Sequence, residues 1–460
     1  MSTTTELSYD ISDRSNLHPQ EPINLQVVGQ AVSASQTTEA KSTKVQGVDE
    51  NNGPFAEVIT AQQAWKDPQI NIWRVSAAFL GFLVQGANDA CFGPLIPSLE
   101  SYFKLSYTVV SLVFLSPFIG YVLAAFLSDR IHMLFGQRGV ALIGPGCRLL
   151  SYVVLSVHPP YPVVLVFLIG AGFGNGLLDA AWNAFVGDLK NANQLLGIIH
   201  GFYGLGASLS PIIATTMVTK YGLQWYTFFF VMVGVALLDL ALSTLAFWDA
   251  TGSEFRNYSA NSNAAGGRMR AVFKNKVTWL CSLFLLSYVG SEVSIGGWLV
   301  VFMLRVRDAA PFASGMTVTG FWLGITVGRV VLGFVTARFG ERRSVSAYLL
   351  LAMGLELVFW LVPQFYVSAV AVGLLGFFLG PLFPAVVVAA TKILPKRMHV
   401  GSIGFSTAVG GSGAAVIPFA VGAIAQAKGV QVLQPIILAL LAVQFGLWLL
   451  LPKIPKSHAE

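Results

Sequence analysis

The sequence predicts an all-α membrane protein with twelve transmembrane helices in two six-helix bundles. Three observations lead to this fold class. First, 55% of the 460 residues are hydrophobic and only 11% are charged, whereas about a quarter of the residues of a soluble domain are charged. Second, the chain contains a series of apolar stretches of about 20 residues, the length that crosses the hydrocarbon core of a bilayer. Third, the first six stretches resemble the second six in sequence.

The predicted spans are separated by short polar connections. They cover residues 72–98, 108–128, 139–157, 161–187, 195–218, 224–247, 277–303, 312–336, 344–362, 364–390, 399–426 and 430–451. Residues 248–276 are the only long internal linker. We therefore expect one bundle over residues 72–247, a second over 277–452 and a short tail over 453–460.

The first 71 residues differ in composition from the rest of the chain. They are rich in Ser, Thr, Gln, Asn and Glu and have too little apolar surface to fold alone. They lack the basic and apolar segments of a cleavable signal peptide, so the first span is expected to act as the insertion signal. We expect a disordered cytosolic tail over residues 1–71.

Lys and Arg are unevenly distributed between the loops on the two sides of the predicted membrane domain. With both chain termini in the cytosol, the cytosolic loops carry Arg130, Arg138, Lys190, Arg256, Arg268, Arg270, Lys274, Lys276, Arg338, Arg342, Arg343, Lys392, Lys396 and Arg397. The outer loops carry Lys104, Lys220, Arg305, Arg307 and Lys428. Because cytosolic loops are enriched in basic residues, this bias predicts an even number of spans and cytosolic ends, with the linker 248–276 also cytosolic.

Several functions are disfavoured by the sequence. Cys91, Cys147 and Cys281 all fall inside predicted spans without metal-ligand spacing, so we expect buried thiols and no metal site. The net charge of +6 is spread over the loops and forms no patch for nucleic acid. No phosphate-binding loop for ATP and no catalytic constellation is evident, so we expect neither an enzyme nor a cofactor. The glycosylation sequon at Asn257 falls in the linker and is expected to be unused.

The two halves contain corresponding segments. "GFLVQGANDACFGP" in the first span corresponds to "LFLLSYVGSEVSIGG" in the seventh, "GFGNG" (172–176) to "GFFLG" (376–380), and "GASLSP" (206–211) to "GAAVIP" (413–418). Repeats of this kind enclose a site near the bilayer midplane in many carriers. The sequence therefore predicts a binding site between the two bundles.

The loops after the second and eighth spans are also related. "SDRIHMLFGQR" contains Asp129, Arg130, Gly136 and Arg138, and "GFVTARFGERR" contains Gly333, Arg338, Gly340, Arg342 and Arg343. Both resemble the loop signature of the major facilitator superfamily, which implies that family's twelve-helix fold and a gating role for the loops. The second copy has Ala337 at the acidic position, and the first has four additional residues before its glycine. A basic loop without a gating contact is the alternative.

Four further fragments narrow the resemblance. "GANDACFGPLIPSLESYF", "GNGLLDAAWNAFVG", "HGFYGLGASLSP" and "GSEVSIGGW" occur in this order. Together they resemble the fucose:proton symporter branch of the superfamily, and especially its fungal members, including the bypass-of-stop-codon type. The similarity extends over residues 72–452.

Asp179 is the most unusual residue of the fourth span. It precedes Asp188, which marks the cytosolic end of the span, by nine residues and so lies about 13 Å deep, close to the midplane. Asn175, Asp179 and Asn183 recur every four residues and form one stripe of the helix, with Trp182 beside it. A polar stripe cannot face lipid, so we expect it to face other helices or a water-filled cavity.

Asp89 lies at a comparable depth in the first span, where Gln85, Asn88 and Asp89 share a face that is followed by Phe92 one turn on. The resemblance to the sugar symporters implies that carboxylates at the positions of Asp89 and Asp179 couple protons and bind sugar, although the second is usually Glu in that family. Physical reasoning agrees, because desolvation penalises a charged carboxylate and favours proton uptake. The alternative for each is a permanently hydrogen-bonded aspartate between helices.

Other candidate residues have less defined roles. Glu292 is expected either to contact the solute or to pack between helices. Arg148 is a candidate charge partner of one of the acids, and Arg329 is expected to have a structural or gating role. Asp239 and Glu356 are expected to be packing residues on peripheral spans. The aromatic residues expected near the cavity are Phe92, Trp182, Tyr203, Trp298 and Trp322.

The sequence thus predicts a secondary carrier that couples protons to a small organic solute, a sugar or sugar-like polyol, by alternating access. A proton-driven exporter of a secondary metabolite or drug is the first alternative, and a nutrient sensor that does not transport is the second. The expected partners are the lipid bilayer, protons and the solute. We expect a monomer in the plasma membrane rather than in an internal membrane. Which of Asp89 and Asp179 carries the proton is left open.

Overall fold

A computed structural model describes residues 63–253, 272–395 and 398–454 of the chain. The described part excludes four segments. These are residues 1–62, most of the linker with Arg256, Asn257, Arg268 and Arg270, the loop residues Lys396 and Arg397, and residues 455–460. Of the predicted tail, residues 63–71 are described. The side chain of Asn71 is buried and donates to the Gln63 side chain and to the Ala64 carbonyl, so this segment packs at the start of the first helix.

The described part of the first half consists of helices and short loops. In chain order these are α1 (Ile70–Ala90), α2 (Phe92–Phe103), α3 (Tyr107–Val110), α4 (Leu112–Ser156), α5 (Tyr161–Gly187), α6 (Ala192–Thr215), the π-helix η1 (Thr216–Lys220), the 3-10 helix η2 (Trp225–Thr227) and α7 (Phe228–Ala246). The break between α1 and α2 falls at Cys91, inside the predicted first span.

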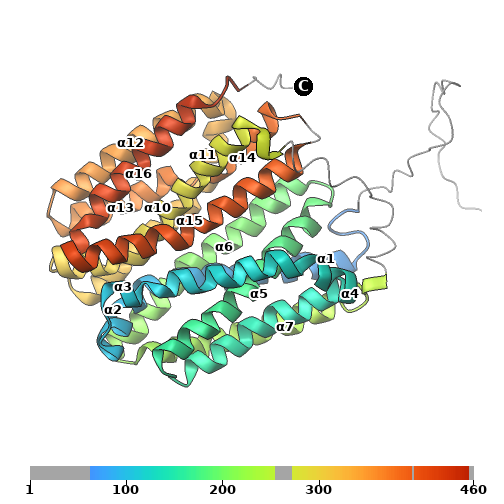
Figure 1. Ribbon diagram of the computed structural model, residues 1–460, viewed down its shortest axis with the longest axis horizontal. Coiled ribbons are helices and arrows are strands. Elements are labelled where there is room, and N and C mark those ends of the chain that lie inside the picture. The colour runs from blue at the N-terminus through green and yellow to red at the C-terminus, as the bar shows by residue number, and fades with distance from the viewer. Residues whose placement is uncertain (1–62, 254–271, 396–397, 455–460) are drawn as a thin grey trace, which may run out of the picture. The chain divides into compact units, whose positions relative to one another are not determined.

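The second half has the same kind of construction. Its helices are α10 (Lys276–Val306), α11 (Pro311–Phe339), α12 (Glu341–Leu361), α13 (Phe365–Leu379), α14 (Leu382–Ile393), α15 (His399–Lys428), the 3-10 helix η4 (Val430–Val432) and α16 (Leu433–Leu450). Figure 1 shows α1–α7 and α10–α16 as two groups of helices. Eleven helices of the described residues are long and apolar enough to cross a membrane.

The structure has eleven long helical segments where twelve spans were predicted, because Tyr107–Ser156 counts as a single segment of 50 residues. Gly136 interrupts it with φ 69° and ψ −164°. A Cβ at Gly172 of α5 would touch Pro117, and one at Gly174 would touch the carbonyl of Gly144. Since Pro117 and Gly144 would lie about 40 Å apart in a straight helix, α4 folds back at Gly136 and contains the second and third spans.

The internal repeat is visible in the helix pairs. In the first half α1 packs on α6, and α4 packs on α5 and α7. In the second half α10 packs on α15, α11 on α13, and α12 on α16, so each half repeats the same pairs of its first and fifth, second and fourth, and third and sixth spans. The corresponding glycines make the closest approaches: a Cβ at Gly206 would collide with the Leu83 carbonyl, and one at Gly413 would collide with the Leu286 carbonyl.

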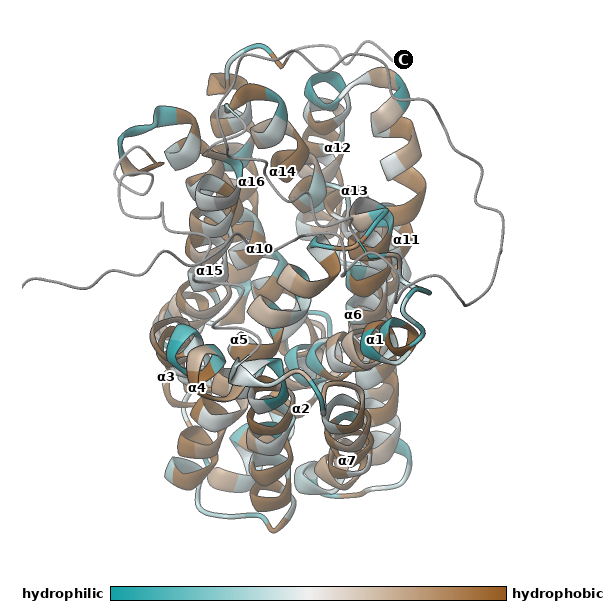
Figure 2. Cartoon of the chain, turned by 90° about the vertical axis from the view of Figure 1, so that its right-hand side faces the viewer, coloured by the Kyte–Doolittle hydropathy of each residue, from teal (hydrophilic) through white to brown (hydrophobic). Residues whose placement is uncertain are grey.

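The sides of the helices are apolar where they are exposed. Large hydrophobic side chains such as Phe126, Leu245 and Phe334 are 78%, 73% and 76% exposed. Figure 2 shows hydrophobic residues along the helices and hydrophilic ones gathered at their ends and in the loops. An apolar surface of this extent is expected of helices that face lipid.

The two halves approach each other closely at the helix ends remote from the loops that contain Gly136 and Gly340. We call this the closed end, and the end that carries those two loops the basic end. At the closed end the backbone N–H of Tyr107 donates to Gln426 across 2.7 Å, and Arg305 lies 3.6 Å from Glu100. A Cβ at Gly422 would lie 2.7 Å from that of Ser111. Contacts between side chains and backbone of opposite halves therefore seal this end.

Candidate functional site

Asp89 lies in the last turn of α1 and is partly buried. The Asn88 side chain donates to its Oδ1 across 3.0 Å, and the Tyr203 hydroxyl, from α6, donates to its Oδ2 across 3.1 Å. The close approach of α1 and α6 through Gly86 and Gly206 brings this tyrosine to the carboxylate. Both oxygens of Asp89 thus accept from neutral donors, which leaves its charge without a cation in direct contact.

Asp179 lies in α5 and is also partly buried. Asn183, one turn further along the same helix, donates to the Asp179 carbonyl across 2.9 Å and to its Oδ1 across 3.0 Å. The helix ends at Gly187 with Asp188 as its C-cap residue, in agreement with the predicted end of the span. The predicted stripe is therefore present on α5, and Asp179 and Asn183 within it hydrogen-bond to each other.

The carboxylates of Asp89 and Asp179 come from different helices and are near enough to interact electrostatically. Tyr121 of α4 interacts electrostatically with both, and its hydroxyl accepts from the Gln85 side chain across 2.9 Å. Within the described residues, neither carboxylate lies within 4.0 Å of a Lys, Arg or His nitrogen. The structure thus brings together two acids that have neutral hydrogen-bond partners and no ion pair.

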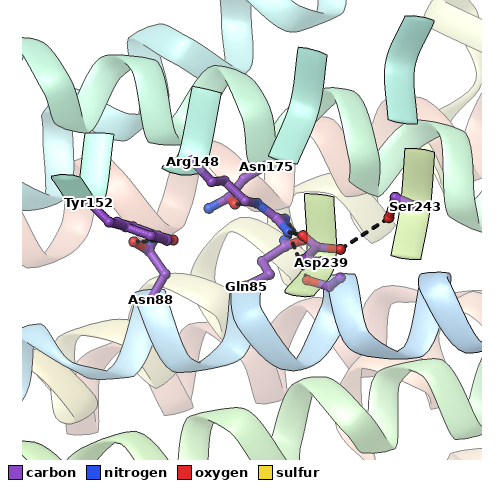
Figure 3. A network of polar contacts seen from close by, with 8 residues as sticks. Gln85, Asn88, Arg148, Tyr152, Asn175, Asp239 and Ser243 are labelled. Atoms are coloured by element: carbon purple, nitrogen blue, oxygen red, sulfur yellow. Dashed lines mark hydrogen bonds and ion pairs between the residues drawn. The ribbon is translucent and has the colours of Figure 1, made fainter. Parts of the chain in front are cut away.

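Arg148 of α4 is the centre of the polar network beside these acids (Figure 3). Its guanidinium lies 3.1 Å from Asp239 of α7, and both side chains are fully buried. It also donates to the Gly81 carbonyl across 3.0 Å and to Gln85. Asp239 therefore has a paired partner, and Arg148 interacts with Asp89 and Asp179 only over a longer range.

Asn175 and Asn88 belong to the same network. Asn175 is fully buried and accepts from the Arg148 guanidinium through its side-chain oxygen, while Asn88 accepts from the Tyr152 hydroxyl across 3.1 Å. Asn175 thus faces Arg148, and Asn88 connects Tyr152 to Asp89. The two amides thus link α5 and α1, the helices that carry Asp179 and Asp89, to α4.

The second half contains a polar cluster of its own. Arg329 of α11 lies 3.2 Å from the Oε1 atom of Glu292 in α10. Tyr203 interacts electrostatically with both Glu292 and Arg329 while donating to Asp89. Tyr203 therefore contacts Asp89 of the first half and lies within electrostatic range of the cluster of the second half.

The candidate aromatic residues pack inside the structure. Phe92 is buried in the main hydrophobic core. Trp182 is fully buried and stacks on Phe247 with ring centroids 4.4 Å apart. Trp298 donates to the Pro418 carbonyl across 2.9 Å and packs on Tyr107 at the closed end. All three rings are thus packed among other side chains, and the hydroxyl of Tyr203 is in direct contact with Asp89.

The signature loops differ between the halves. Gly136 and Gly340 both have positive φ, and the backbone N–H of Arg138 donates to the Ala250 carbonyl across 2.9 Å. Arg342 donates to the carbonyls of Leu449 and Leu451 at the end of α16. The remaining polar signature residues, Asp129, Arg130, Arg338 and Arg343, are exposed.

The acids of the two signature loops have distinct environments. Asp129 forms no ion pair within 4.0 Å in the described part of the chain. The second loop has Ala337 at that position, and its nearby acid Glu341 binds Lys392 of α14, a contact that the sequence pattern did not identify. Gly333 has open space around it. The loops thus brace helices within one half, and this conformation shows no ion pair at Asp129.

The cysteines and the other possible metal ligands of the described residues are scattered. The described residues contain no group of three or more His, Cys, Asp or Glu side chains that could hold a metal ion. Cys91 and Cys281 are buried, and Cys147 is partly buried.

The chain is similar to known proteins over most of its length. Residues 78–316 and 280–460 both match the Major Facilitator Superfamily. The chain belongs to this superfamily. It is 33% identical over 419 residues to the Bypass of stop codon protein 6 of Saccharomyces cerevisiae, covering 84% of each chain. It is 24% identical over 361 residues to the glucose/mannose transporter GlcP of Bacillus subtilis, covering 74% of this chain and 85% of that protein.

Two solved structures have the same fold. A bacterial homologue of the human lysosomal transporter Spinster, in an inward-facing and occupied conformation, matches with a TM-score of 0.63 and 13% identity over 82% of this chain and 95% of that one. The superfamily transporter FucP in the outward conformation matches with a TM-score of 0.59 and 17% identity over 82% and 97%. The chain is therefore a multi-pass membrane protein of the transporter fold, and the resemblance seen in its sequence motifs is confirmed.

Proposed function

We propose that this protein is a proton-coupled secondary carrier of a sugar or sugar-like polyol that works by alternating access. Asp89 and Asp179 are the residues that take up the proton and contact the solute. Among the other acids inside the bundle, Asp239 and Glu292 are each held by an arginine, and Glu356 is buried in α12 without a hydrogen-bond partner among the described residues. Asp89 and Asp179 differ from all three, because they are partly buried, interact with each other and accept from neutral donors only, and this difference is the observation that supports the proposal.

The proposed proton uptake follows from the free energy that is required to keep an uncompensated carboxylate charge away from water. A buried carboxylate is strongly disfavoured unless it is paired, hydrogen-bonded or neutralised by a proton. The neutral donors Asn88, Tyr203 and Asn183 offset only part of that cost. When the site closes around the solute, proton binding to Asp89 or Asp179 lowers the free energy of the closed state, so the proton and the solute favour the same transition.

We infer a sugar as the solute from the side chains at the site and from the names of related transporters. Carboxylates, amides and tyrosine hydroxyls are groups that bind sugar hydroxyls, and they meet here between α1, α4, α5 and α6. The glucose/mannose transporter of Bacillus subtilis supports a sugar for this chain as well.

Alternating access requires that the halves separate at one end while they close at the other. The contacts of Tyr107, Ser111 and Glu100 with the second half support a state in which the closed end is shut. We propose that the basic end faces the cytosol, in agreement with its arginines, and that the plasma membrane holds the protein. The structure then corresponds to a state that gives access to the cytosol.

The test is uptake of labelled D-glucose, D-mannose and L-fucose into proteoliposomes, with and without an imposed pH gradient. We expect one of these sugars to accumulate only with the gradient. Asp179→Asn should abolish accumulation and retain at least part of the counterflow exchange, because the solute can still bind without the coupled proton. Asp188→Asn, an exposed aspartate at the end of the same helix, is the matched control and should accumulate normally.

Three results would contradict the proposal or a part of it. Normal accumulation by Asp179→Asn excludes this residue from coupling. Binding of a sugar without any flux, measured in the same vesicles, indicates a sensor, and outward movement of an unrelated metabolite with no response to sugars indicates an exporter.

A further inference from the structure

Tyr288, Glu292 and Arg329 form a compact cluster between α10 and α11. Tyr288 and Glu292 are one helical turn apart on α10, and both are buried. Arg329 donates from one terminal nitrogen to the Oε1 atom of Glu292 across 3.2 Å. The hydroxyl of Tyr288 interacts electrostatically with both partners. The cluster therefore combines a carboxylate, a guanidinium and a phenol that come from two helices.

Two polar atoms of this cluster lack a well-formed hydrogen bond. The Nε atom of Arg329 and the hydroxyl of Tyr288 are buried, and neither has a partner with hydrogen-bond geometry among the described residues, although the Tyr288 hydroxyl is close enough to Glu292 and Arg329 to interact with both. A third donor, Nε1 of Trp322, is buried without a partner two turns before Arg329 on α11. A buried unpaired donor costs about 1–3 kcal/mol, so several such donors on one seam between two helices indicate a place where a ligand supplies the acceptors.

The cluster adjoins the proposed site of the first half. Tyr203 of α6 donates to Asp89 and interacts electrostatically with Glu292 and Arg329. His200, one turn earlier on α6, interacts electrostatically with Arg329. A solute that contacts Asp89 from the first half can thus reach the unpaired donors of the second half.

The charges select the kind of ligand. Glu292 and Arg329 neutralise each other, and the ionisable groups of the first half that interact with them are Tyr203 and His200 of α6. Because the arginine of this cluster is already paired with Glu292, an anionic solute has little positive charge to bind, whereas a neutral hydroxyl can accept from Arg329 or Tyr288 and donate to Glu292. A hydroxyl group fits this set of donors and acceptors better than a carboxylate does.

We propose that Tyr288, Glu292 and Arg329 bind one or two hydroxyl groups of a neutral polyhydroxylated solute and determine which sugar the carrier accepts. This inference rests on the proposed function and deepens it, because it assigns specificity to the second half and proton coupling to the first. The solute then bridges the two halves, and its hydroxyls supply the partners that the buried donors lack.

The experiment uses the sugar that accumulates in the uptake test, taken here as D-glucose, and compares it with its single-deoxy analogues as competitors of labelled uptake in proteoliposomes that contain the full chain. For the unsubstituted protein we expect one deoxy analogue to bind about tenfold to one hundredfold more weakly than D-glucose, the effect of one lost hydrogen bond to a charged or buried partner. Tyr288→Phe and Arg329→Lys should weaken D-glucose by a similar factor. Each should also remove the difference between D-glucose and that one analogue.

The comparison separates specificity from structure. A purely structural role of Tyr288 or Arg329 would weaken all analogues equally and leave the ratio unchanged, which overturns this inference while the proposed function stands. Tyr366→Phe, at a tyrosine that is 75% exposed, is the matched control and should leave every ratio unchanged. If Tyr288→Phe does not fold, Arg329→Lys, which keeps the charge next to Glu292, decides by the same ratio. No uptake of any sugar by the unsubstituted protein overturns both proposals.

Discussion

Arg148 of α4 and Asp239 of α7 form an ion pair with 3.1 Å between nitrogen and oxygen, and neither side chain has exposed surface. The pair holds three helices together, because the same guanidinium donates to the Gly81 carbonyl of α1. Ser243, one turn along α7, donates to the other oxygen of Asp239. The charges of Arg148 and Asp239, which lie beside the proposed proton site, are therefore fixed in position by buried hydrogen bonds.

Removing one member of this pair should destabilise the protein strongly. Asp239→Leu leaves the buried charge of Arg148 without its partner, and breaking a buried pair costs about 3–5 kcal/mol. We expect a clear fall in the unfolding temperature, measured by fluorescence-detected size-exclusion chromatography in detergent. Asp249→Leu, at an exposed aspartate just beyond the same helix, is the control and should change little.

The double variant Arg148→Met/Asp239→Leu provides a sharper test. Replacing both members by apolar residues removes both charges at once, and such replacements are often nearly neutral. We expect the double variant to be more stable than Asp239→Leu alone. A double variant that is less stable than either single variant would show that Arg148 acts through Gly81, Gln85 and Asn175 and not through the ion pair.

The helices of this protein could be predicted closely from the sequence. Apolar runs of about 20 residues have few alternatives to a membrane helix, and α5 occupies the predicted residues 161–187. The repeat could also be predicted, since Gly206 and Gly413 make equivalent contacts. The position at which α4 folds back could be predicted only from the signature loop. Gly136 of that loop interrupts an otherwise continuous helical segment.

The partners within the site could not be predicted in the same way. The helix α7 is apolar nearly all around, so its sequence does not indicate which neighbour Asp239 faces and predicts only a packing role for that residue. The hydroxyl of Tyr203 contacts Asp89, although the sequence identified Tyr203 only as an aromatic near the cavity. The Lys392 and Glu341 pair joins segments 51 positions apart. These contacts depend on helix rotation and tertiary packing, which periodicity does not specify.

The glycines that bring the first and fifth spans of each half together should not tolerate a methyl group. A Cβ at Gly86 would collide with the Tyr203 carbonyl, and one at Gly413 would collide with the Leu286 carbonyl. Overpacking of this kind costs about 1–3 kcal/mol, and here backbone must move. We expect Gly86→Ala and Gly413→Ala to lower the unfolding temperature and the yield of monodisperse protein.

A glycine without close neighbours is the control for these two. Gly234 lies in α7, and no atom lies within 4 Å of the place that a methyl group would occupy. Replacing Gly by Ala inside a helix is favourable by up to about 1 kcal/mol, so Gly234→Ala should be neutral or slightly stabilising. Equal losses at all three positions would indicate a general intolerance of the helices and not the close approach of particular pairs.

Locking the closed end should stop transport if the halves must separate there in every cycle. The Cβ of Ser111 and a Cβ at Gly422 would be 2.7 Å apart, so a small shift allows a disulfide between cysteines at these positions. We expect Ser111→Cys/Gly422→Cys to form the cross-link with a mild oxidant and to lose at least about 90% of its uptake, because the closed end can then no longer open.

Recovery of uptake after reduction would show that the disulfide blocks opening of the closed end and that the oxidant has not inactivated the protein in another way. Reduction of the disulfide should restore uptake to the level of the untreated double variant. Each single variant should be insensitive to the oxidant, because it lacks the second engineered cysteine, and the native Cys91 and Cys281 are buried while Cys147 is partly buried. Full uptake by a completely cross-linked protein would show that the contacts at Ser111 and Gly422 persist through the cycle. The halves would then not separate at Ser111 and Gly422 during transport, which contradicts alternating access through this end.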